Sequence, residues 1–305
     1  MSILKKATTG TLPKAQVYTI YGPNGVGKTT LASRFPNPVM FDLEDGSQSV
    51  GHKDFLRIAK KEIPGLDEYM LALNDIWKDP ADRKTLITDS VEALESLIHK
   101  SLCKEQGVES IEDIPYGRGN VYAREKMEAI MRLYHRIRDD RGLTVILVGH
   151  SIVKSFTDPK ANQTYDRYIM RANDKFASII RDLSDGVFFV NHKVITEKGQ
   201  NPAKAKAFST GDRVIHTVWS HAYDAKSRYA LPAEINFSLV SVEKAVSELI
   251  PKSGEDLVHQ INQLKSRVAD QDLVQKIDKA ITEAGKDDEK LKVIKSRLME
   301  LTQTL

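Results

Sequence analysis

Gln16-Val-Tyr-Thr-Ile-Tyr-Gly22-Pro-Asn-Gly-Val-Gly-Lys28-Thr-Thr-Leu-Ala32 is the stretch of this chain that decides its fold. Its first residues, up to Tyr21, form a short apolar run that is typical of a buried strand. The following residues fit G-x-x-x-x-G-K-[ST], in which glycines let backbone N–H groups point at phosphate oxygens where a helix begins. The pattern predicts a phosphate-binding loop between a strand and a helix.

The residues of this loop and of the first helical turn are expected to hold a nucleotide. Lys28 is expected to reach the β- and γ-phosphates, and the Thr29 hydroxyl to bind Mg²⁺. No Asn-Lys-x-Asp pattern for reading guanine occurs in the chain, which favours ATP over GTP. The expected cofactors are therefore ATP and Mg²⁺, held at Gly22, Pro23, Asn24, Gly25, Val26, Gly27, Lys28, Thr29 and Thr30.

Outward from this loop, further short runs rich in Val, Ile and Phe predict more buried strands. They are Pro38 to Asp42, Thr85 to Asp89, Thr144 to Gly149 and Gly186 to Asn191, and most are separated by segments with helical apolar spacing. Strands that alternate with helices predict an α/β fold with a mainly parallel central sheet covered on both faces. Two later runs, 213–221 and 226–231, are joined by 222–225 and predict a late β-hairpin that extends this sheet.

Polar residues stand where the predicted strands end, which is the ligand-binding edge of such a sheet. Asp89 closes the third run and supplies a second magnesium ligand. In Phe41-Asp42-Leu-Glu44, Glu44 is the candidate general base that orients the attacking water, and Asp42 is the reserve. His150 closes the fourth run and is a candidate contact for the γ-phosphate, although a lone histidine is as often structural.

The composition is that of an ordinary globular protein, with 305 residues, 41% hydrophobic and 29% charged. The net charge of only +3 does not by itself indicate a nucleic-acid partner. A single cysteine, Cys103, excludes an internal disulfide, and neither a signal peptide nor a membrane span is expected. We expect a cytoplasmic protein with no membrane partner, in the host cytoplasm if a phage encodes it.

The C-terminal part differs in composition from the rest of the chain. Phe237 is the last aromatic residue, and 68 residues follow it. Apolar residues at helical spacing predict two or three amphipathic helices there, which more often pack than bind partners. We therefore expect a core domain over 1–240 and a helical region over 241–305. The apolar positions are Leu257, Ile261, Leu264, Val268, Leu291, Ile294, Leu298 and Leu301.

The motifs and their order resemble the RecA-type recombinase core. The phosphate loop comes first, then Phe41-Asp-Leu-Glu44, then Leu86-Ile-Thr-Asp89-Ser, then a strand with a polar end. The phrases Tyr21 to Ala32 and Ala225-Lys-Ser-Arg-Tyr229 look like those of short RecA-like ATPases of bacteriophages, some of which are Sak-type single-strand annealing proteins. The resemblance covers about residues 1 to 240 and implies a RecA-like P-loop NTPase fold.

This resemblance also implies roles for single residues. Glu44 falls on the catalytic glutamate of the family, and His150 on a glutamine that couples nucleotide state to DNA binding. Lys226 and Arg228 resemble a Lys-x-Lys pair that reaches the γ-phosphate of a neighbouring subunit. Catalysis by Lys28, Asp89 and Glu44 would then depend on assembly into a ring or filament.

Two basic segments are candidates for binding DNA. Residues 152–176 combine five basic residues with interleaved aromatic rings and match the second DNA-binding loop of RecA-like proteins. The first such loop corresponds to 107–124, and the stretch 193–229 carries a net charge of +4. Either segment alone is more often a solvated surface. The candidate contacts are Lys154, Phe156, Lys160, Arg167, Tyr168, Arg171 and Arg118.

The sequence therefore favours a DNA-dependent ATPase that binds single-stranded DNA in recombination or annealing, as a homo-oligomer. A single-strand-binding protein is a further candidate partner. The first alternative is an ATP-controlled adaptor similar to a helicase loader, in which the C-terminal helices hold a replication partner. A small-molecule kinase is the second alternative, because P-loops serve many reactions.

Overall fold

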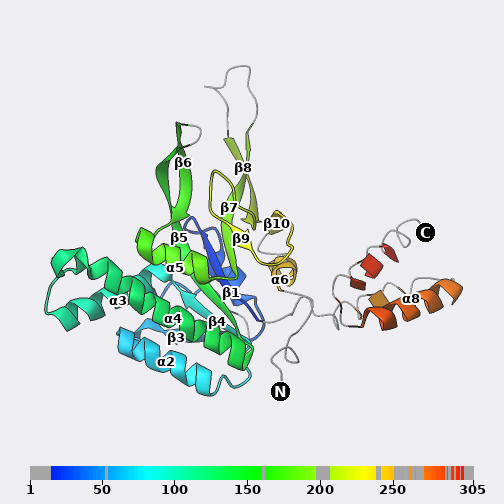
Figure 1. Cartoon of the computed structure of the whole chain (residues 1–305), viewed down its shortest axis with the longest axis horizontal. Coiled ribbons are helices and arrows are strands. Elements are labelled where there is room, and N and C mark those ends of the chain that lie inside the picture. Colours follow the sequence, from blue (N-terminus) through cyan, green and yellow to red (C-terminus); the bar gives the residue numbers. More distant parts are fainter. Residues whose placement is uncertain are drawn as a thin grey trace, which may run out of the picture. The chain divides into compact units, whose positions relative to one another are not determined.

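The chain is built around one large β-sheet. The computed structural model describes residues 15–51, 54–159, 162–196, 207–237 and 242–250, and, in the C-terminal part, residues 258, 261–262, 265, 271–285, 287, 290–291, 293–295 and 297–298. The strands are β1 (Val17–Gly22), β2 (Pro38–Asp42), β3 (Leu56–Ala59), β4 (Thr85–Asp89), β5 (Thr144–Asp158), β6 (Gln163–Met170), β7 (Gly186–Thr196), β8 (Ala207–His216), β9 (Lys226–Ser227) and β10 (Glu234–Phe237). Their order is β10-β8-β7-β1-β5-β4-β2-β3, with β6 paired to β5 and β9 to β7 (Figure 1).

The central strands β7, β1, β5, β4, β2 and β3 run parallel to one another. The five apolar runs of the sequence correspond to β1, β2, β4, β5 and β7, so the predicted parallel sheet is confirmed. The register places Gly22 beside His150 and Asp42 beside Asp89. These strand ends meet at one side of the sheet, which we call the carboxyl edge.

The helices are α1 (Lys28–Ser33), α2 (Leu66–Lys78), α3 (Val91–Gln106), α4 (Gly119–Arg141), α5 (Asp174–Leu183), α6 (Val242–Leu249) and α8 (Gln271–Ala284), with short 3₁₀ turns η2 (Lys60–Glu62), η3 (Ile111–Asp113) and η4 (Pro115–Gly117). The Ser90 side chain caps α3, and α4 ends at Gly142 in the left-handed conformation that suits glycine. None of the described helices is long and apolar enough to cross a membrane.

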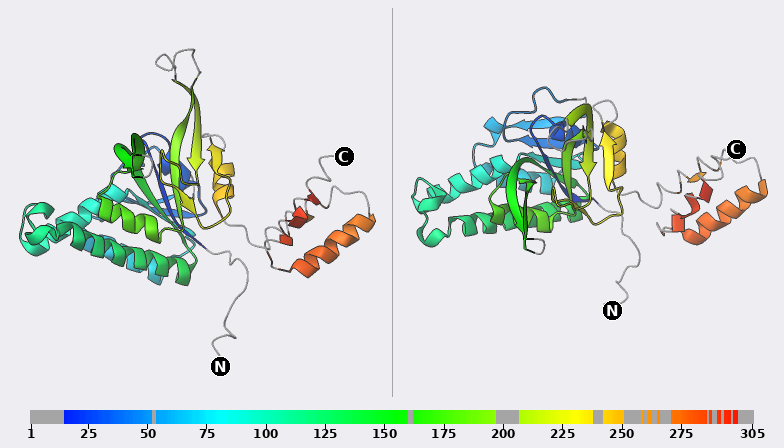
Figure 2. Two further views of the ribbon diagram at one scale, coloured as in Figure 1. Left: turned by 45° about the horizontal axis from the view of Figure 1, so that its top comes forward. Right: turned by 90° about the horizontal axis from the view of Figure 1, so that it is seen from above.

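Helices cover both faces of the sheet, as predicted. Helices α2, α3, α4 and α5 bury their apolar sides against one face, in a core that includes Val17, Tyr21 and Phe189. Tyr18 points to the other face, where it contacts Phe35 after α1 and donates a hydrogen bond to the carbonyl of Leu249 in α6 (2.8 Å). Figure 2 shows α4 and α5 on one side of the strands and α6 on the other.

Two β-hairpins project from the carboxyl edge (Figure 1). Strand β5 continues beyond Gly149 and pairs with β6, from Ser151 opposite Met170 to Asp158 opposite Gln163. Strand β7 likewise continues beyond the sheet and pairs with β8. The segment 197–206 that joins β7 to β8 lies outside the described residues.

The late hairpin predicted from 213–221 and 226–231 is not formed. Strand β8 ends at His216 and belongs to the β7–β8 hairpin, while β9 pairs with the beginning of β7. Residues 217–225, which we call the connecting segment, run between them. Tyr223 in this segment stacks on Phe189 of β7 (ring centroids 4.9 Å apart). Packing onto the sheet therefore separates two runs that lie close in the sequence.

The chain divides into two compact units at Leu249, later than the expected boundary at 240. Helix α6 belongs to the larger unit because it packs against β10. The described part of the C-terminal unit is helical and has its own apolar cluster, which includes the predicted positions Ile261, Ile294, Leu291 and Leu298. The other predicted positions, Leu257, Leu264, Val268 and Leu301, lie outside the described residues.

Candidate functional site

The loop between β1 and α1 has the geometry of a phosphate cradle. A Cβ on Gly22 would lie 2.0 Å from the carbonyl oxygen of Val190, so only glycine fits where the chain leaves the sheet. Gly27 caps the N-terminus of α1 with φ 96°, a conformation that favours glycine. Lys28 folds back over the loop and donates to the carbonyls of Gly22 (3.0 Å) and Pro23 (2.8 Å). The predicted loop thus places a buried ammonium at a helix N-terminus.

Thr29 and Asp89 meet at this loop, as predicted for a pair of magnesium ligands. The Thr29 hydroxyl donates to Oδ2 of Asp89 over 2.6 Å. A hydroxyl and a carboxylate oxygen are the hard ligands that Mg²⁺ prefers, so the donor set fits this ion. Burial raises the pKa of Asp89 to about 6, although the hydrogen bond from Thr29 lowers it. A cation at this position would favour the charged carboxylate.

Burial and nearby carboxylates have opposite effects on the pKa of Lys28. Burial lowers the pKa of Lys28 to about 8, while the carboxylates of Asp89, Glu92 and Glu44 raise it. Removing an ammonium from water disfavours its charged form, and nearby negative charge restores it. Phosphate groups in the cradle would add negative charge next to Lys28 and hold it protonated.

The two candidate bases after β2 have different environments. Asp42 is buried and accepts hydrogen bonds from the backbone N–H groups of Gly46 and Ser47, and Arg57 lies 3.7 Å away. Glu44 is exposed at the carboxyl edge and accepts a hydrogen bond from the Ser90 hydroxyl. Asp42 therefore shapes its own loop, which leaves Glu44 to face the phosphate cradle.

His150 is bound to a residue that the sequence did not single out. Glu92, in the first turn of α3, accepts from the His150 backbone N–H (2.7 Å) and lies 3.1 Å from its Nδ1. Burial raises the pKa of Glu92, but these hydrogen bonds outweigh it and lower the pKa below its usual value. An ionised carboxylate can only accept, so Nδ1 carries the proton and Nε2 is left for another partner. The one sequence signal for Glu92 was an acid just after Asp89.

Glu44, Glu92 and His150 lie together at the carboxyl edge. One ligand atom from each falls within 4.8 Å of the others. Ser90 already donates to Glu44, and His150 to both oxygens of Glu92. The three side chains therefore form a cluster beside the phosphate cradle, with separate hydrogen bonds from Ser90 to Glu44 and from His150 to Glu92.

Arg171 lies at the same edge, although the sequence assigned it to DNA. Its backbone N–H donates to the carbonyl of His150 over 2.9 Å, and its side chain is exposed. The Arg171 charge adds to the effects that lower the pKa of Lys28. Arg171 is therefore a second cation at the carboxyl edge, and its charge acts on Lys28.

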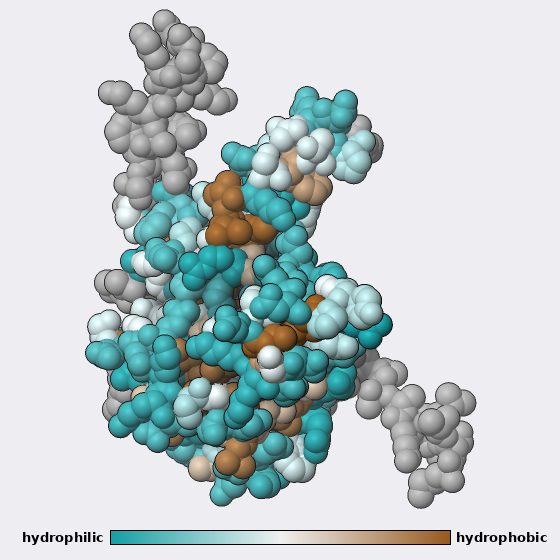
Figure 3. Space-filling model, turned by 90° about the vertical axis from the view of Figure 1, so that its left-hand side faces the viewer, coloured by the Kyte–Doolittle hydropathy of each residue, from teal (hydrophilic) through white to brown (hydrophobic). Residues whose placement is uncertain are grey.

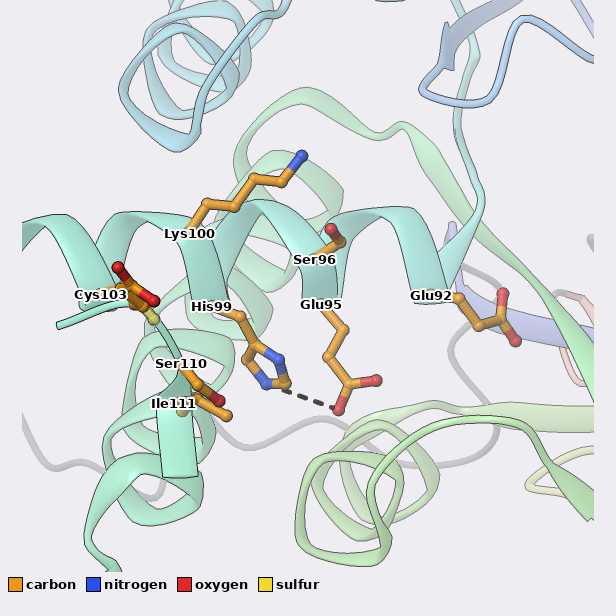
Figure 4. A pocket seen from close by; sticks show the side chains of 9 residues that line it. Glu92, Glu95, Ser96, His99, Lys100, Cys103, Ser110 and Ile111 are labelled. Atoms are coloured by element: carbon orange, nitrogen blue, oxygen red, sulfur yellow. Dashed lines mark ion pairs between the residues drawn. The ribbon is translucent and has the colours of Figure 1, made fainter. Parts of the chain in front are cut away.

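Helix α3 leads from this site into a pocket of about 450 Å³. Glu92, Glu95, His99 and Cys103 line it along one side of α3, and Ser110 and Ile111 complete it (Figure 4). Glu95 lies 3.9 Å from Nε2 of His99, and burial lowers the pKa of this histidine. Glu92 thus belongs both to this pocket and to the phosphate site.

The segment 152–176 was predicted as a loop, but it consists of the end of β5, the whole of β6 and the start of α5, while its binding of DNA stays a prediction. Phe176 is buried in the core. Tyr168 packs on Phe189, with ring centroids 5.0 Å apart, and Arg167 donates to Asp224 over 2.7 Å. These side chains serve the fold because the hairpin is anchored on the connecting segment.

Other predicted DNA contacts lie at the surface. Lys154 is exposed and ion-paired with Asp174 (2.9 Å), and Phe156 is partly exposed. Arg118 is the residue before α4, and its guanidinium lies 5.9 Å from the exposed ring of Tyr116. Its segment, 107–124, was predicted as a flexible loop but consists largely of η3, η4 and the start of α4. Lys160 lies outside the described residues, as do Lys198, Lys204 and Lys206.

Lys226 and Arg228 lie at the edge of the sheet opposite to the phosphate cradle of their own chain. Lys226 donates to the carbonyl of Asp182 (3.2 Å), and Arg228 to Oδ1 of the buried Asp185 (2.7 Å). Asp185 also accepts from Arg138 and from the backbone N–H at the start of β1. The structure does not bring either cation to Lys28, so any catalytic role requires another subunit.

Comparison with known proteins agrees with this geometry. Residues 14–229 match the family model described as AAA domain. A stretch of 203 residues is 24% identical to the SPbeta prophage-derived uncharacterized protein YorG of Bacillus subtilis (strain 168), covering 65% of this chain and 55% of that protein. The chain thus spans about half the length of this relative. Because the family model covers more than half of the chain, this protein belongs to the AAA domain family of P-loop ATPases, which implies nucleotide binding, usually with Mg²⁺.

Proposed function

We propose that this P-loop ATPase binds single-stranded DNA under the control of ATP and acts in recombination or annealing, as a homo-oligomer. The observation that carries the proposal is that both projecting hairpins leave the sheet at the carboxyl edge, next to the phosphate cradle. Similarity to a prophage protein supports a phage origin, and the Sak-type annealing role is proposed from the resemblance to phage RecA-like ATPases.

His150 is the connection between the two parts of this proposal. It stands beside Gly22 in the sheet, at the position where β5 leaves the sheet to become the β5–β6 hairpin. Its Nε2 is left for a phosphate oxygen because Nδ1 is held by Glu92. A contact that is made with ATP and lost with ADP would therefore act directly on the base of the hairpin.

The hydrolysis step uses side chains of the carboxyl edge. Glu44 orients the attacking water and accepts its proton, and the ammonium of Lys28 stabilises charge on the transferred phosphoryl group. Thr29 and Asp89 would hold Mg²⁺, which would supply further positive charge to the phosphates. Arg171 adds a cation from the end of the β5–β6 hairpin.

The test is whether single-stranded DNA and ATP affect each other. We expect single-stranded DNA to raise the steady-state ATPase rate, and a labelled oligonucleotide to bind more tightly with a non-hydrolysable ATP analogue than with ADP, as measured by fluorescence anisotropy. Lys28→Ala is the matched control, because it should remove the nucleotide effect on DNA binding. An ATPase rate that ignores DNA, with no DNA binding in any nucleotide state, would overturn the proposal.

The C-terminal unit favours a second candidate, an ATP-controlled adaptor similar to a helicase loader. This unit has an apolar cluster of its own, around Ile261, Ile277 and Leu291, and is compact by itself. Truncation after Leu249 separates the two candidates. A recombination protein should keep DNA-stimulated ATPase activity, whereas an adaptor should keep ATP hydrolysis and lose its protein partner.

A further inference from the structure

An exposed aromatic cluster joins the β5–β6 hairpin to the connecting segment. We call it the outer cluster; its members are Phe156, Tyr165, Arg167, Trp219 and His221. The rings of Phe156 and Tyr165 lie 5.6 Å apart, those of Tyr165 and His221 5.9 Å, and those of Trp219 and His221 4.8 Å. The cluster thus spans two segments far apart in the sequence.

Arg167 holds this cluster together. Its guanidinium carbon lies 5.4 Å from the centre of the Phe156 ring and 5.9 Å from that of Trp219. The same guanidinium is fixed by an ion pair with Asp224 in the connecting segment. A cation near the face of an aromatic ring attracts it. Arg167 therefore favours the present positions of Phe156 and Trp219 although both rings stay exposed.

Trp219 and Phe156 are exposed by 53% and 39%, and the neighbouring Val218 by 53%. They differ from the inner rings Tyr168 and Phe189, which pack in or against the core. Figure 3 shows apolar side chains exposed near the bases of the projecting segments. Exposed apolar side chains that lie next to one another mark a binding surface more often than single ones do.

We infer that Trp219 and Phe156 form a platform on which bases of single-stranded DNA stack, an inference that rests on the proposed function. Rings fixed beside a cation are the feature that binds successive bases without regard to sequence. The ion pair with Asp224 neutralises the charge of Arg167, so the platform offers mainly aromatic faces, which suit the flat faces of bases. Lys193, which is exposed on β7, can follow the DNA backbone, and Lys154 on β5 can do so by exchanging its exposed ion pair with Asp174 for a phosphate.

The two tryptophans of the chain provide a direct test. Trp77 lies in α2, under Arg136 and hydrogen-bonded to Asp140, away from the outer cluster. In Trp77→Phe the only tryptophan is Trp219, and we expect oligo(dT) to quench its fluorescence while an abasic oligonucleotide of equal length quenches it much less. In the matched variant Trp219→Phe, only Trp77 remains, and oligo(dT) should leave its emission unchanged.

Affinity measured by anisotropy of a labelled oligonucleotide completes the experiment. Trp219→Ala should weaken binding about tenfold or more, and Trp219→Phe, which keeps a ring, should restore most of the affinity. Binding by the full chain without quenching of Trp219, and with unchanged affinity in Trp219→Ala, would overturn the inference and leave the proposed function standing. The absence of any DNA binding would overturn both. A loss of self-association in Trp219→Ala, with DNA binding intact, would assign the cluster to a subunit contact instead.

Discussion

Two carboxylates that stand two positions apart, Asp42 and Glu44, are given different roles by their surroundings. The Asp42 carboxylate is committed to the N–H groups and the hydroxyl of its own loop, and to Arg57. Among the residues that the structure describes, Glu44 accepts a hydrogen bond from the Ser90 hydroxyl, and it faces solvent at the carboxyl edge. A general base must reach a water molecule, so the burial and hydrogen bonds of Asp42 favour Glu44 for that role and keep Asp42 as the reserve.

The first prediction separates these roles by mutation. Glu44→Gln should lower the ATPase kcat by roughly 10²–10⁴-fold and leave ATP affinity and thermal stability nearly unchanged. Asp42→Asn should instead lower the free energy of unfolding by about 1–3 kcal/mol, because a buried acceptor network loses its charge. Steady-state kinetics and denaturant titration of both variants measure this. The reverse pattern would show that Asp42 is the base.

The second prediction concerns Arg171. If its guanidinium contacts the phosphates, Arg171→Ala should weaken the binding of a fluorescent ATP analogue by about 10- to 150-fold, the value of a charge-assisted hydrogen bond of roughly 1.5–3 kcal/mol. Arg132→Ala is the matched control, since Arg132 is an exposed cation on α4. Equal losses in both variants, or none in Arg171→Ala, would contradict the assignment.

At the scale of elements, the contact between α3 and β5 joins the phosphate cradle to the β5–β6 hairpin. Glu92 comes from the beginning of α3, and His150 from the point where β5 leaves the sheet. Each hydrogen bond of this pair joins two elements that the sequence predicts separately. Because α3 and β5 meet here, a change at the phosphate cradle can act on the start of the β5–β6 hairpin.

The third prediction tests this connection. Glu92→Ala should reduce the stimulation of ATPase activity by single-stranded DNA by about 2- to 30-fold, since residues that couple sites modulate coupling by roughly 0.5–2 kcal/mol. Glu92→Gln, whose amide oxygen can still accept from His150, should keep part of the stimulation. Glu105→Ala, at the other end of α3, is the control for a general effect on the helix. Full stimulation in Glu92→Ala would exclude this route.

At the scale of the whole molecule, the position of Lys226 and Arg228 makes assembly testable. In our fourth prediction, Lys226→Ala and Glu44→Gln are each inactive, and an equal mixture regains activity at about one quarter of the subunit interfaces, because only those combine two intact halves. Thermal denaturation of each variant is measured in parallel. A mixture that stays inactive, together with a lowered Tm for Lys226→Ala, would assign this cation to the support of α5 alone.

The stability of the larger unit should also depend on pH. Burial lowers the pKa values of His99, His135 and His216 below the usual 6.5, although hydrogen bonding or nearby charges partly oppose this in the latter two. Each of these histidines therefore binds more protons near pH 6 in the unfolded chain than in the folded chain, so its contribution to stability is present above pH 6.5 and is lost as the pH falls. Asp89, whose pKa burial raises to about 6, opposes this in part. We expect the denaturant midpoint to fall between pH 7.5 and pH 5.5 at constant ionic strength, and His135→Gln to reduce this dependence. A midpoint that does not change over this range would contradict the fifth prediction.

Much of the fold could be predicted from the sequence because its signals are local. The apolar runs of β1, β2, β4, β5 and β7 and the glycines of the phosphate loop depend on near neighbours only. Strand ends that meet at one edge follow from parallel pairing, so Lys28, Thr29 and Asp89 could be placed together in advance. Roles that depend on partners distant in the sequence could not be predicted. Tyr168 packs on Phe189, and Arg167 pairs with Asp224, and neither contact can be read from neighbouring residues.

By itself, the sequence determined that this chain is a P-loop protein with a mainly parallel sheet and candidate catalytic carboxylates at its edge. Only the tertiary structure decided that 152–170 is a hairpin, that residues 217–225 connect separate strands, and that Glu92 holds His150. It also decided which exposed rings stay in place beside Arg167. The physical reason is that hydrogen bonds and ring contacts between distant segments depend on how the strands pair, which local composition does not encode.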